Sequence, residues 1–440
     1  MVSRSRIDLT PASGVRSPFS LWFTPGERVA LINLGCARNL VDSEHILGQA
    51  KAAGALLVDI KDADTLIVNT CAFVIDAKQE TIDTLQELIA LKKKGKIKKI
   101  VALGCFAKRY AEIFQKEFPE IDLVLGLMPL SKEKNLPREL LTPPWSAYVK
   151  ICEGCYNQCS FCAIPGIKGA FASRHLAPIL EEVKALEARG VKEINVIGQD
   201  ITAYGFDLKG SATLAGLLKK ILAQTTQIRW IRLLYAFPRH ISDELLDLIA
   251  QEERICPYLD VPLQHISDKV LRSMNRGFTR AQTLKLIERI RRKIPNCCLR
   301  TAFIVGFPQE TDQDFRELCQ FVQDVQFDRV GVFEYSKEEG TRAAKIKDQI
   351  PGRIKHSRYN TLMKIQQPIS AKRLQRFVGQ DLEVLVEEKK ENGLFIGRRS
   401  QDAPEVDGEV FIKTSQALKL GSFIKARIVD SLEYDLVARI

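Results

Sequence analysis

Three short apolar segments in the first third of the chain each end in a cysteine, and they constrain the fold more than any other feature. The segments VALINLGC, LIVNTC and IVALGC have the length and apolar character of buried parallel strands, and they end at Cys36, Cys71 and Cys105. Stretches with apolar residues at helical spacing lie between them, which predicts a parallel sheet with crossover helices. Because parallel strands end at one edge of a sheet, we expect the three thiols to meet there. The alternative is three core cysteines that end strands by coincidence.

A second alternating series follows a linker that contains LTPPW. Six strand-like segments separated by helical patterns are too few to close an eight-stranded barrel, so they predict a partial (β/α)6 barrel. The last part alternates short strands with Gly, Asn and Pro, and it has the size of a small β-barrel of the oligonucleotide-binding type. The predicted fold class is therefore α/β, with a flexible extension at 1–27, a parallel sheet domain at 28–140, the partial barrel at 141–376 and the small β-barrel at 377–440.

The composition indicates a protein that stays in the cytoplasm and has no membrane partner. No run approaches the roughly 18 apolar residues that a membrane span requires, and the opening segment lacks the apolar centre of a secretory signal. That segment is rich in Ser and Arg, so an organellar transit peptide is the alternative. In an intracellular chain, eleven cysteines indicate metal ligands or core thiols rather than disulfides.

The charge is unevenly distributed. The chain has a formal net charge of +11, which is compatible with a nucleic-acid partner. Residues 337–376 carry eleven Lys and Arg against three acidic residues, whereas residues 377–440 carry nine against twelve. The basic segment could contact a nucleic acid or be a solvated surface, and the acidic tail would suit a basic protein partner.

The stretch CEGCYNQCSFC places Cys152, Cys155, Cys159 and Cys162 on one short loop. A structural zinc site is one interpretation, but its two cysteine pairs are usually much further apart in sequence. An iron–sulfur cluster, whose iron atoms are spread over a cube, suits closely spaced cysteines better.

The spacing of Cys155, Cys159 and Cys162, with Phe161 before the last, resembles the motif of the radical S-adenosylmethionine superfamily. The resemblance implies that these cysteines hold three irons of a [4Fe–4S] cluster and that the open fourth iron binds S-adenosylmethionine. Cys152 is then not a ligand, because a fourth thiolate would close the site. Phe161 is expected beside the cofactor, as are Gly198, Gln199 and Asp200 of the GQD segment, where family members hold the cofactor's amino group.

From about residue 28 onward the chain resembles the methylthiotransferases, in which the three N-terminal cysteines hold a second [4Fe–4S] cluster. The segments LGCARNLVDSE, GQDITAYGFD, VPLQHISDKVL and SQDAPEVDGEVFI look like the RimO branch, and Asp200 stands where the transfer-RNA branch has Asn. The resemblance implies methylthiolation of the β-carbon of an aspartate in small-subunit ribosomal protein twelve, free or in the assembled subunit. It also implies an electron donor and a sulfur source, and it names no catalytic side chain.

Two alternatives remain from the residues alone. The same chemistry could modify an adenosine in transfer RNA, or the chain could be a zinc-stabilised nucleic-acid-binding protein without catalysis. The other cysteines have no ligand spacing and are expected to pack in the core; they are Cys256, Cys297, Cys298 and Cys319. His265 at the end of the fourth barrel strand could face the site, although a lone histidine is more often structural.

Overall fold

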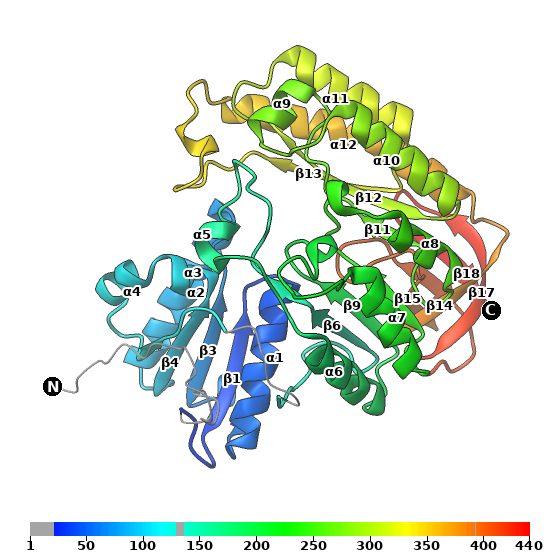
Figure 1. Ribbon diagram of the computed structural model, residues 1–440. Coiled ribbons are helices and arrows are strands. Elements are labelled where there is room, and N and C mark those ends of the chain that lie inside the picture. The colour runs from blue at the N-terminus through cyan, green and yellow to red at the C-terminus, as the bar shows by residue number, and fades with distance from the viewer. Residues whose placement is uncertain (1–21, 129–135, 392) are drawn as a thin grey trace. The chain divides into compact units, whose positions relative to one another are not determined.

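The computed structural model describes residues 22–128, 136–391 and 393–440 (Figure 1). Most of the extension predicted at 1–27 lies outside these residues. The chain forms two compact units, one of Met1–Leu141 with Ala163–Glu182 and one of Thr142–Cys162 with Val183–Ile440. None of the helices in the described ranges is long and apolar enough to cross a membrane.

The first unit contains the predicted parallel sheet, with strand order β2-β1-β3-β4-β5. Leu66 and Val68 of β3 pack on one face with α2, while Ile67 between them packs on the other. Both faces are therefore covered, which explains why the strands are apolar without alternation. The strands are β1 (Arg28–Asn33), β2 (Leu56–Leu57), β3 (Thr65–Thr70), β4 (Lys99–Gly104) and β5 (Leu123–Val124); the helices are α1 (Ala37–Ala52), α2 (Ile75–Lys93), α3 (Cys105–Arg109), α4 (Ala111–Glu117) and α5 (Ile164–Lys168).

The second unit contains six parallel strands in two groups, β10-β9-β6 and β11-β12-β13. A parallel bridge between Ile231 and Ile255 joins the groups, which confirms the partial barrel. Capping boxes start two of its helices, with Thr279 and Thr311 bonded to the third residue of α10 and α11. The strands are β6 (Ser146–Lys150), β9 (Glu193–Ile197), β10 (Trp230–Leu233), β11 (Tyr258–Asp260), β12 (Cys298–Val305) and β13 (Arg329–Glu334); the helices are α7 (Leu214–Gln224), α8 (Asp243–Gln251), α9 (Asp268–Ser273), α10 (Arg280–Lys293), α11 (Asp312–Val325) and α12 (Gly352–Gln375). Helix α6 (Leu176–Ala188) is divided between the two units after Glu182.

The last strands close into the expected small barrel, in the order β14-β15-β16-β18-β17. The sequence indicated four of these strands and missed β18, a short strand next to the end of the chain that pairs with both β16 and β17. The strands are β14 (Asp381–Lys389), β15 (Leu394–Arg398), β16 (Val410–Lys413), β17 (Phe423–Ser431) and β18 (Leu436–Arg439).

The small barrel docks on residues at the amino ends of the parallel strands. Trp230, the first residue of β10, packs edge to face on Phe423 with ring centroids 4.8 Å apart. Arg329, the first residue of β13, binds Asp402 at 2.7 Å. These contacts leave the carboxyl ends of the strands, where barrels place their chemistry, on the opposite side.

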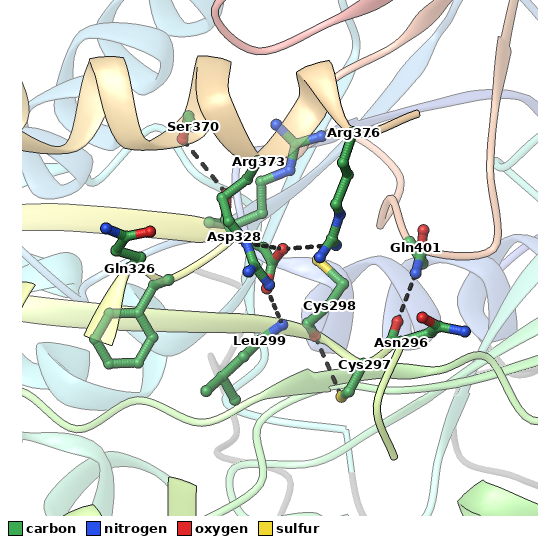
Figure 2. Close-up of polar contacts among 12 residues, drawn as sticks. Asn296, Cys297, Cys298, Leu299, Gln326, Asp328, Ser370, Arg373, Arg376 and Gln401 are labelled. Atoms are coloured by element: carbon green, nitrogen blue, oxygen red, sulfur yellow. Dashed lines mark hydrogen bonds and ion pairs between the residues drawn. The ribbon is translucent and has the colours of Figure 1, made fainter. Parts of the chain in front are cut away.

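Helix α12 is fastened to the start of β13 through one carboxylate (Figure 2). Asp328 receives hydrogen bonds from Arg373 at 2.8 Å and from Arg376 at 3.0 Å. The same carboxylate accepts the backbone N–H of Leu299 at 3.0 Å, so it also holds β12.

Some charged residues of the basic segment 337–376 and of the acidic tail 377–440 form ion pairs within the protein. Among the basic residues 337–376, Arg358 binds Glu310, and Arg373 and Arg376 bind Asp328. The acidic tail likewise places carboxylates against arginines, among them Glu383, Glu387, Asp402 and Asp407. The local charge excess therefore overstates what is available to an outside partner.

Glu193 is fully buried at the junction between the two barrels. Its carboxylate lies 2.7 Å from Arg398 and 3.0 Å from Arg232, and it accepts the Ser146 hydroxyl at 2.8 Å. Burial would raise the pKa of Glu193, but the two guanidinium groups outweigh it and lower the pKa to about 2. The carboxylate is thus held charged between two buried cations.

We expect Glu193→Gln to lower the free energy of unfolding by about 3–5 kcal/mol, because it leaves Arg232 and Arg398 buried without their shared carboxylate. Two of the three tryptophans, Trp145 and Trp230, lie at this junction, so urea unfolding followed by tryptophan fluorescence reports on it.

Asp381→Asn is the control, because Asp381 pairs with Arg427 in a contact whose side chains are 44% and 58% exposed and should contribute below about 1 kcal/mol. The charged Glu193 carboxylate contributes its full stabilisation at any pH above the pKa that it has in the unfolded chain. The difference in unfolding free energy between wild type and Glu193→Gln should therefore shrink as the pH falls from about 5 towards 2. Equal unfolding midpoints for the two variants at neutral pH would contradict the account.

Candidate functional site

The three strand-end cysteines of the first unit lie at the carboxyl edge of its sheet, as predicted. Cys71 directly follows β3, Cys105 directly follows β4, and Cys36 lies between β1 and α1. In a sheet with this strand order, the chain leaves the neighbouring strands β1 and β3 in opposite directions. Such sheets bind ligands between these two connections, at the carboxyl ends of the strands. Cys36 and Cys71 follow these two strands.

The three thiols influence one another electrostatically. Burial, and to a smaller extent ionised Cys36 and Cys71, raise the pKa of Cys105 to about 11. Surrounding protein atoms also oppose ionisation of Cys36, but Arg38, two backbone N–H groups and Lys168 together lower its pKa. Cys36 keeps solvent access, whereas Cys71 is half-buried and Cys105 is buried.

Two residues that the sequence analysis did not identify, Lys168 and Asn39, act on the strand-end cysteines. The Lys168 side chain, 2% exposed, lies 3.9 Å from Asp42 and favours the thiolate forms of Cys36 and Cys105. Asn39 Nδ2 lies 3.9 Å from Cys105 Sγ and bonds to the carbonyl of Thr70 at 3.2 Å.

The backbone before Cys105 requires glycine. Gly104 has a φ of 96°, and a Cβ there would collide with Asn69 and Thr70. The strand can therefore turn directly into α3 and leave Cys105 at the sheet edge.

The second set, Cys155, Cys159 and Cys162, lies on the loop after β6 and the short strand β7 (Cys152–Glu153). All three are partly exposed. Burial raises the pKa of Cys155, while the backbone and side-chain N–H groups of Asn157 oppose this effect. The loop thus follows the carboxyl end of the first barrel strand, where the sequence placed it.

Cys152 packs against the segment that follows β9. It is fully buried, and its Sγ lies 3.6 Å from the carbonyl oxygen of Asp200. A Cβ at Gly198 would collide with that sulfur, so Gly198 makes room for it. Burial raises the pKa of the Cys152 thiol far above its usual range. This environment supports the prediction that Cys152 is a packing residue.

Asp200 is a junction between the cysteine loop and the neighbouring strand ends. One carboxylate oxygen accepts Asn157 Nδ2 at 2.8 Å and lies 3.1 Å from His240 Nδ1. The other accepts the Thr202 backbone N–H at 3.0 Å and the Thr202 hydroxyl. The carboxylate therefore positions the loop beside Cys155, and its predicted part in cofactor binding stays a prediction.

Gln199 is the GQD residue best placed to contact a ligand. Its amide Nε2 donates to Glu153 at 2.7 Å, and Glu153 binds Lys150 at 2.7 Å. Its Oε1 is buried and has no hydrogen-bond partner within the described ranges. Phe161 packs against a cluster that includes Met274 and Phe307.

The remaining candidates lie in buried or half-buried positions. Cys256, Cys297 and Cys298 are buried and Cys319 is half-buried. Burial lowers the pKa of His265 to about 3, so the ring is neutral, and its Nδ1 accepts the Ser267 N–H at 3.0 Å. Across residues 22–128, 136–391 and 393–440, no three His, Cys, Asp or Glu side chains converge to hold one metal ion. The assignment of each cysteine set to an iron–sulfur cluster therefore depends on the position of its cysteines after parallel strands. For the first set it also depends on the effect that Cys36 and Cys71 have on the pKa of Cys105.

Three protein families match consecutive parts of the chain. The Radical SAM superfamily matches residues 149–322, the Uncharacterized protein family UPF0004 matches residues 28–126, and the TRAM domain matches residues 378–440. The cysteine loop falls in the first match and the strand-end cysteines in the second.

Relatives match almost the whole chain. Ribosomal protein uS12 methylthiotransferase RimO of Geotalea uraniireducens is 45% identical over 94% of this chain and 98% of its own length. The protein of the same name from Syntrophotalea carbinolica is 46% identical over 94% and 96%. Among solved structures, the radical S-adenosylmethionine methyltransferase TsrM from Kitasatospora setae aligns with a TM-score of 0.51 over 70% of this chain and 73% of its own, at 16% identity, which supports the fold.

Cys152→Ala should keep the wild-type iron content, because its sulfur lies against Gly198 and the Asp200 carbonyl. Cys159→Ala, which removes a predicted ligand, should lose about half of the iron in a chain with two clusters of four irons each. The measurement is iron per chain after anaerobic reconstitution. Loss of iron from Cys152→Ala alone would show that the ligand set was assigned wrongly.

Proposed function

Because the chain belongs to the family of ribosomal protein uS12 methylthiotransferases RimO, we propose that it attaches a methylthio group to the β-carbon of an aspartate in uS12. The observation that carries this proposal is the match at 45–46% identity over 94% of the chain. The same comparisons show that the chain is a radical S-adenosylmethionine enzyme. Transfer RNA as the substrate has less support, because these relatives are named for a ribosomal protein.

The family uses S-adenosylmethionine and a [4Fe–4S] cluster, and we assign this cluster to Cys155, Cys159 and Cys162. A second cluster on Cys36, Cys71 and Cys105 is supported by their common place at the sheet edge and by Lys168, a cation that favours thiolates. When bound, the first cluster would supply the electron that cleaves the cofactor, a step beyond the reach of protein side chains.

The chain's own residues bind and orient. Gln199 offers a buried acceptor oxygen that suits the ammonium group of S-adenosylmethionine. Asp200 holds the cysteine loop through Asn157, and Gly198 gives strand β9 a close approach to Cys152. Phe161 supports the loop from the apolar side.

Several finer points belong to the same proposal. The uS12 substrate is free or within the small subunit, and the reaction needs an external electron donor and a sulfur source. The cytoplasm, where small subunits are modified, is the expected location. A contact with ribosomal RNA would use those basic residues of α12 that internal carboxylates do not bind.

Gln199→Leu should weaken binding of S-adenosylmethionine about 10- to 100-fold, because a hydrogen bond to a charged group contributes roughly 1.5–3 kcal/mol. Equilibrium dialysis against the reconstituted, oxidised protein measures this. Gln227→Leu, at an exposed position, is the control. Equal affinities for wild type and Gln199→Leu, at equal iron content, would remove Gln199 from the cofactor site.

The direct test of function is the intact mass of uS12 from cells with and without this gene, with fragmentation to locate any difference. We expect one methylthio increment on one aspartate, present with the wild-type gene and absent with Cys159→Ala. An unchanged uS12, together with a methylthio change in transfer RNA, would contradict the proposed substrate and leave the reaction type standing.

A further inference from the structure

Arg276 reaches a predicted cluster ligand from a distant part of the sequence. Its Nη1 lies 3.1 Å from the Sγ of Cys159 and donates to it, while Nη2 donates to the carbonyl of Pro262. The residue is only 4% exposed and lies in the turn between α9 and α10. A buried cation is therefore aimed at one of the three sulfurs of the cysteine loop.

Two aromatic rings hold the guanidinium in place. Its central carbon lies 4.4 Å from the ring centroid of Phe237 and 5.3 Å from that of Phe278. Arginine favours such contacts because its planar, weakly hydrated cation is attracted to ring faces. These contacts limit the side chain to a small range of positions.

The backbone around Arg276 is joined to the cysteine loop independently of the guanidinium. Ser160 donates its N–H to the Met274 carbonyl at 2.9 Å and its hydroxyl to the Ser273 carbonyl at 2.7 Å. Asn275 Nδ2 donates to the Gln158 carbonyl at 2.7 Å. Three hydrogen bonds besides those of Arg276 therefore join the turn to the loop and hold the Arg276 backbone near Cys159.

We propose that Arg276 is a positioning residue that donates a hydrogen bond to the Cys159 thiolate and raises the reduction potential of the cluster on Cys155, Cys159 and Cys162. The inference rests on the ligand assignment made under the proposed function. Hydrogen bonds to cluster sulfurs and nearby positive charge both set reduction potentials. Both effects stabilise the reduced cluster more than the oxidised cluster, because the reduced cluster carries one more negative charge.

The geometry requires arginine rather than lysine. One arm binds the Pro262 carbonyl and the other binds the sulfur, with the plane resting on aromatic rings. A lysine ammonium is a compact charge on a flexible stem and cannot keep this planar, two-armed arrangement. Arg276→Lys should keep the charge and lose the fixed direction of the hydrogen bond.

The test is an EPR-monitored redox titration of the intact protein with both clusters. The relevant signal is the one that changes when S-adenosylmethionine is added, and the other cluster is an internal reference. For Arg276→Gln we expect reduction to become at least tenfold less favourable, which is a downward shift of the reduction potential by at least about 59 mV for one electron. Arg276→Lys should shift in the same direction by less, and the reference signal should not move.

Arg272→Gln is the matched control, since Arg272 lies on α9 and is exposed. Wild-type potential in Arg276→Gln at full iron content would overturn the inference. If Arg276→Gln loses the cluster, Arg276→Lys decides, and an unshifted potential there overturns it equally. A wild-type protein without any signal that responds to S-adenosylmethionine would contradict the ligand assignment itself, and this inference with it.

Discussion

Parallel strand pairing is the constraint on which the chemistry of this chain depends. In both units the strands run side by side in one direction, so that residues following different strands meet at one edge. In the first unit this places Cys36, Cys71 and Cys105, which are far apart in sequence, at the same edge of the sheet. In the second it places the loop of Cys155, Cys159 and Cys162 beside Asp200 and His240.

Sets of thiolates are electrostatically costly, and each unit places cations near them. Lys168 favours ionisation of Cys36 and Cys105, and Arg276 donates to Cys159. The same use of buried charge recurs at the other end of the partial barrel, where Glu193 lies between Arg232 and Arg398. That junction fixes the small barrel at the amino ends of the strands, away from the cysteine loop.

Local pattern was sufficient for much of this structure. Apolar runs ending in cysteine gave the sheet and its edge, and six alternating units gave the partial barrel. What the sequence could not show were contacts between residues with no periodic relation, such as Arg276 with Cys159 or Glu193 with Arg398. The charge totals of the two segments were also a poor guide to binding partners, because Asp402 and Arg373 form ion pairs within the molecule. The segment SQDAPEVDGEVFI, which resembles the RimO branch, includes residues that lock the small barrel to the strands.

The most direct test of the central claim is a crystal structure of the anaerobically purified protein, with iron located by its anomalous scattering. The account predicts two clusters of iron, one bound by Cys36, Cys71 and Cys105 and one by Cys155, Cys159 and Cys162, with Cys152 outside both. A single iron site, a zinc ion on the loop cysteines, or a bond from iron to Cys152 would contradict it.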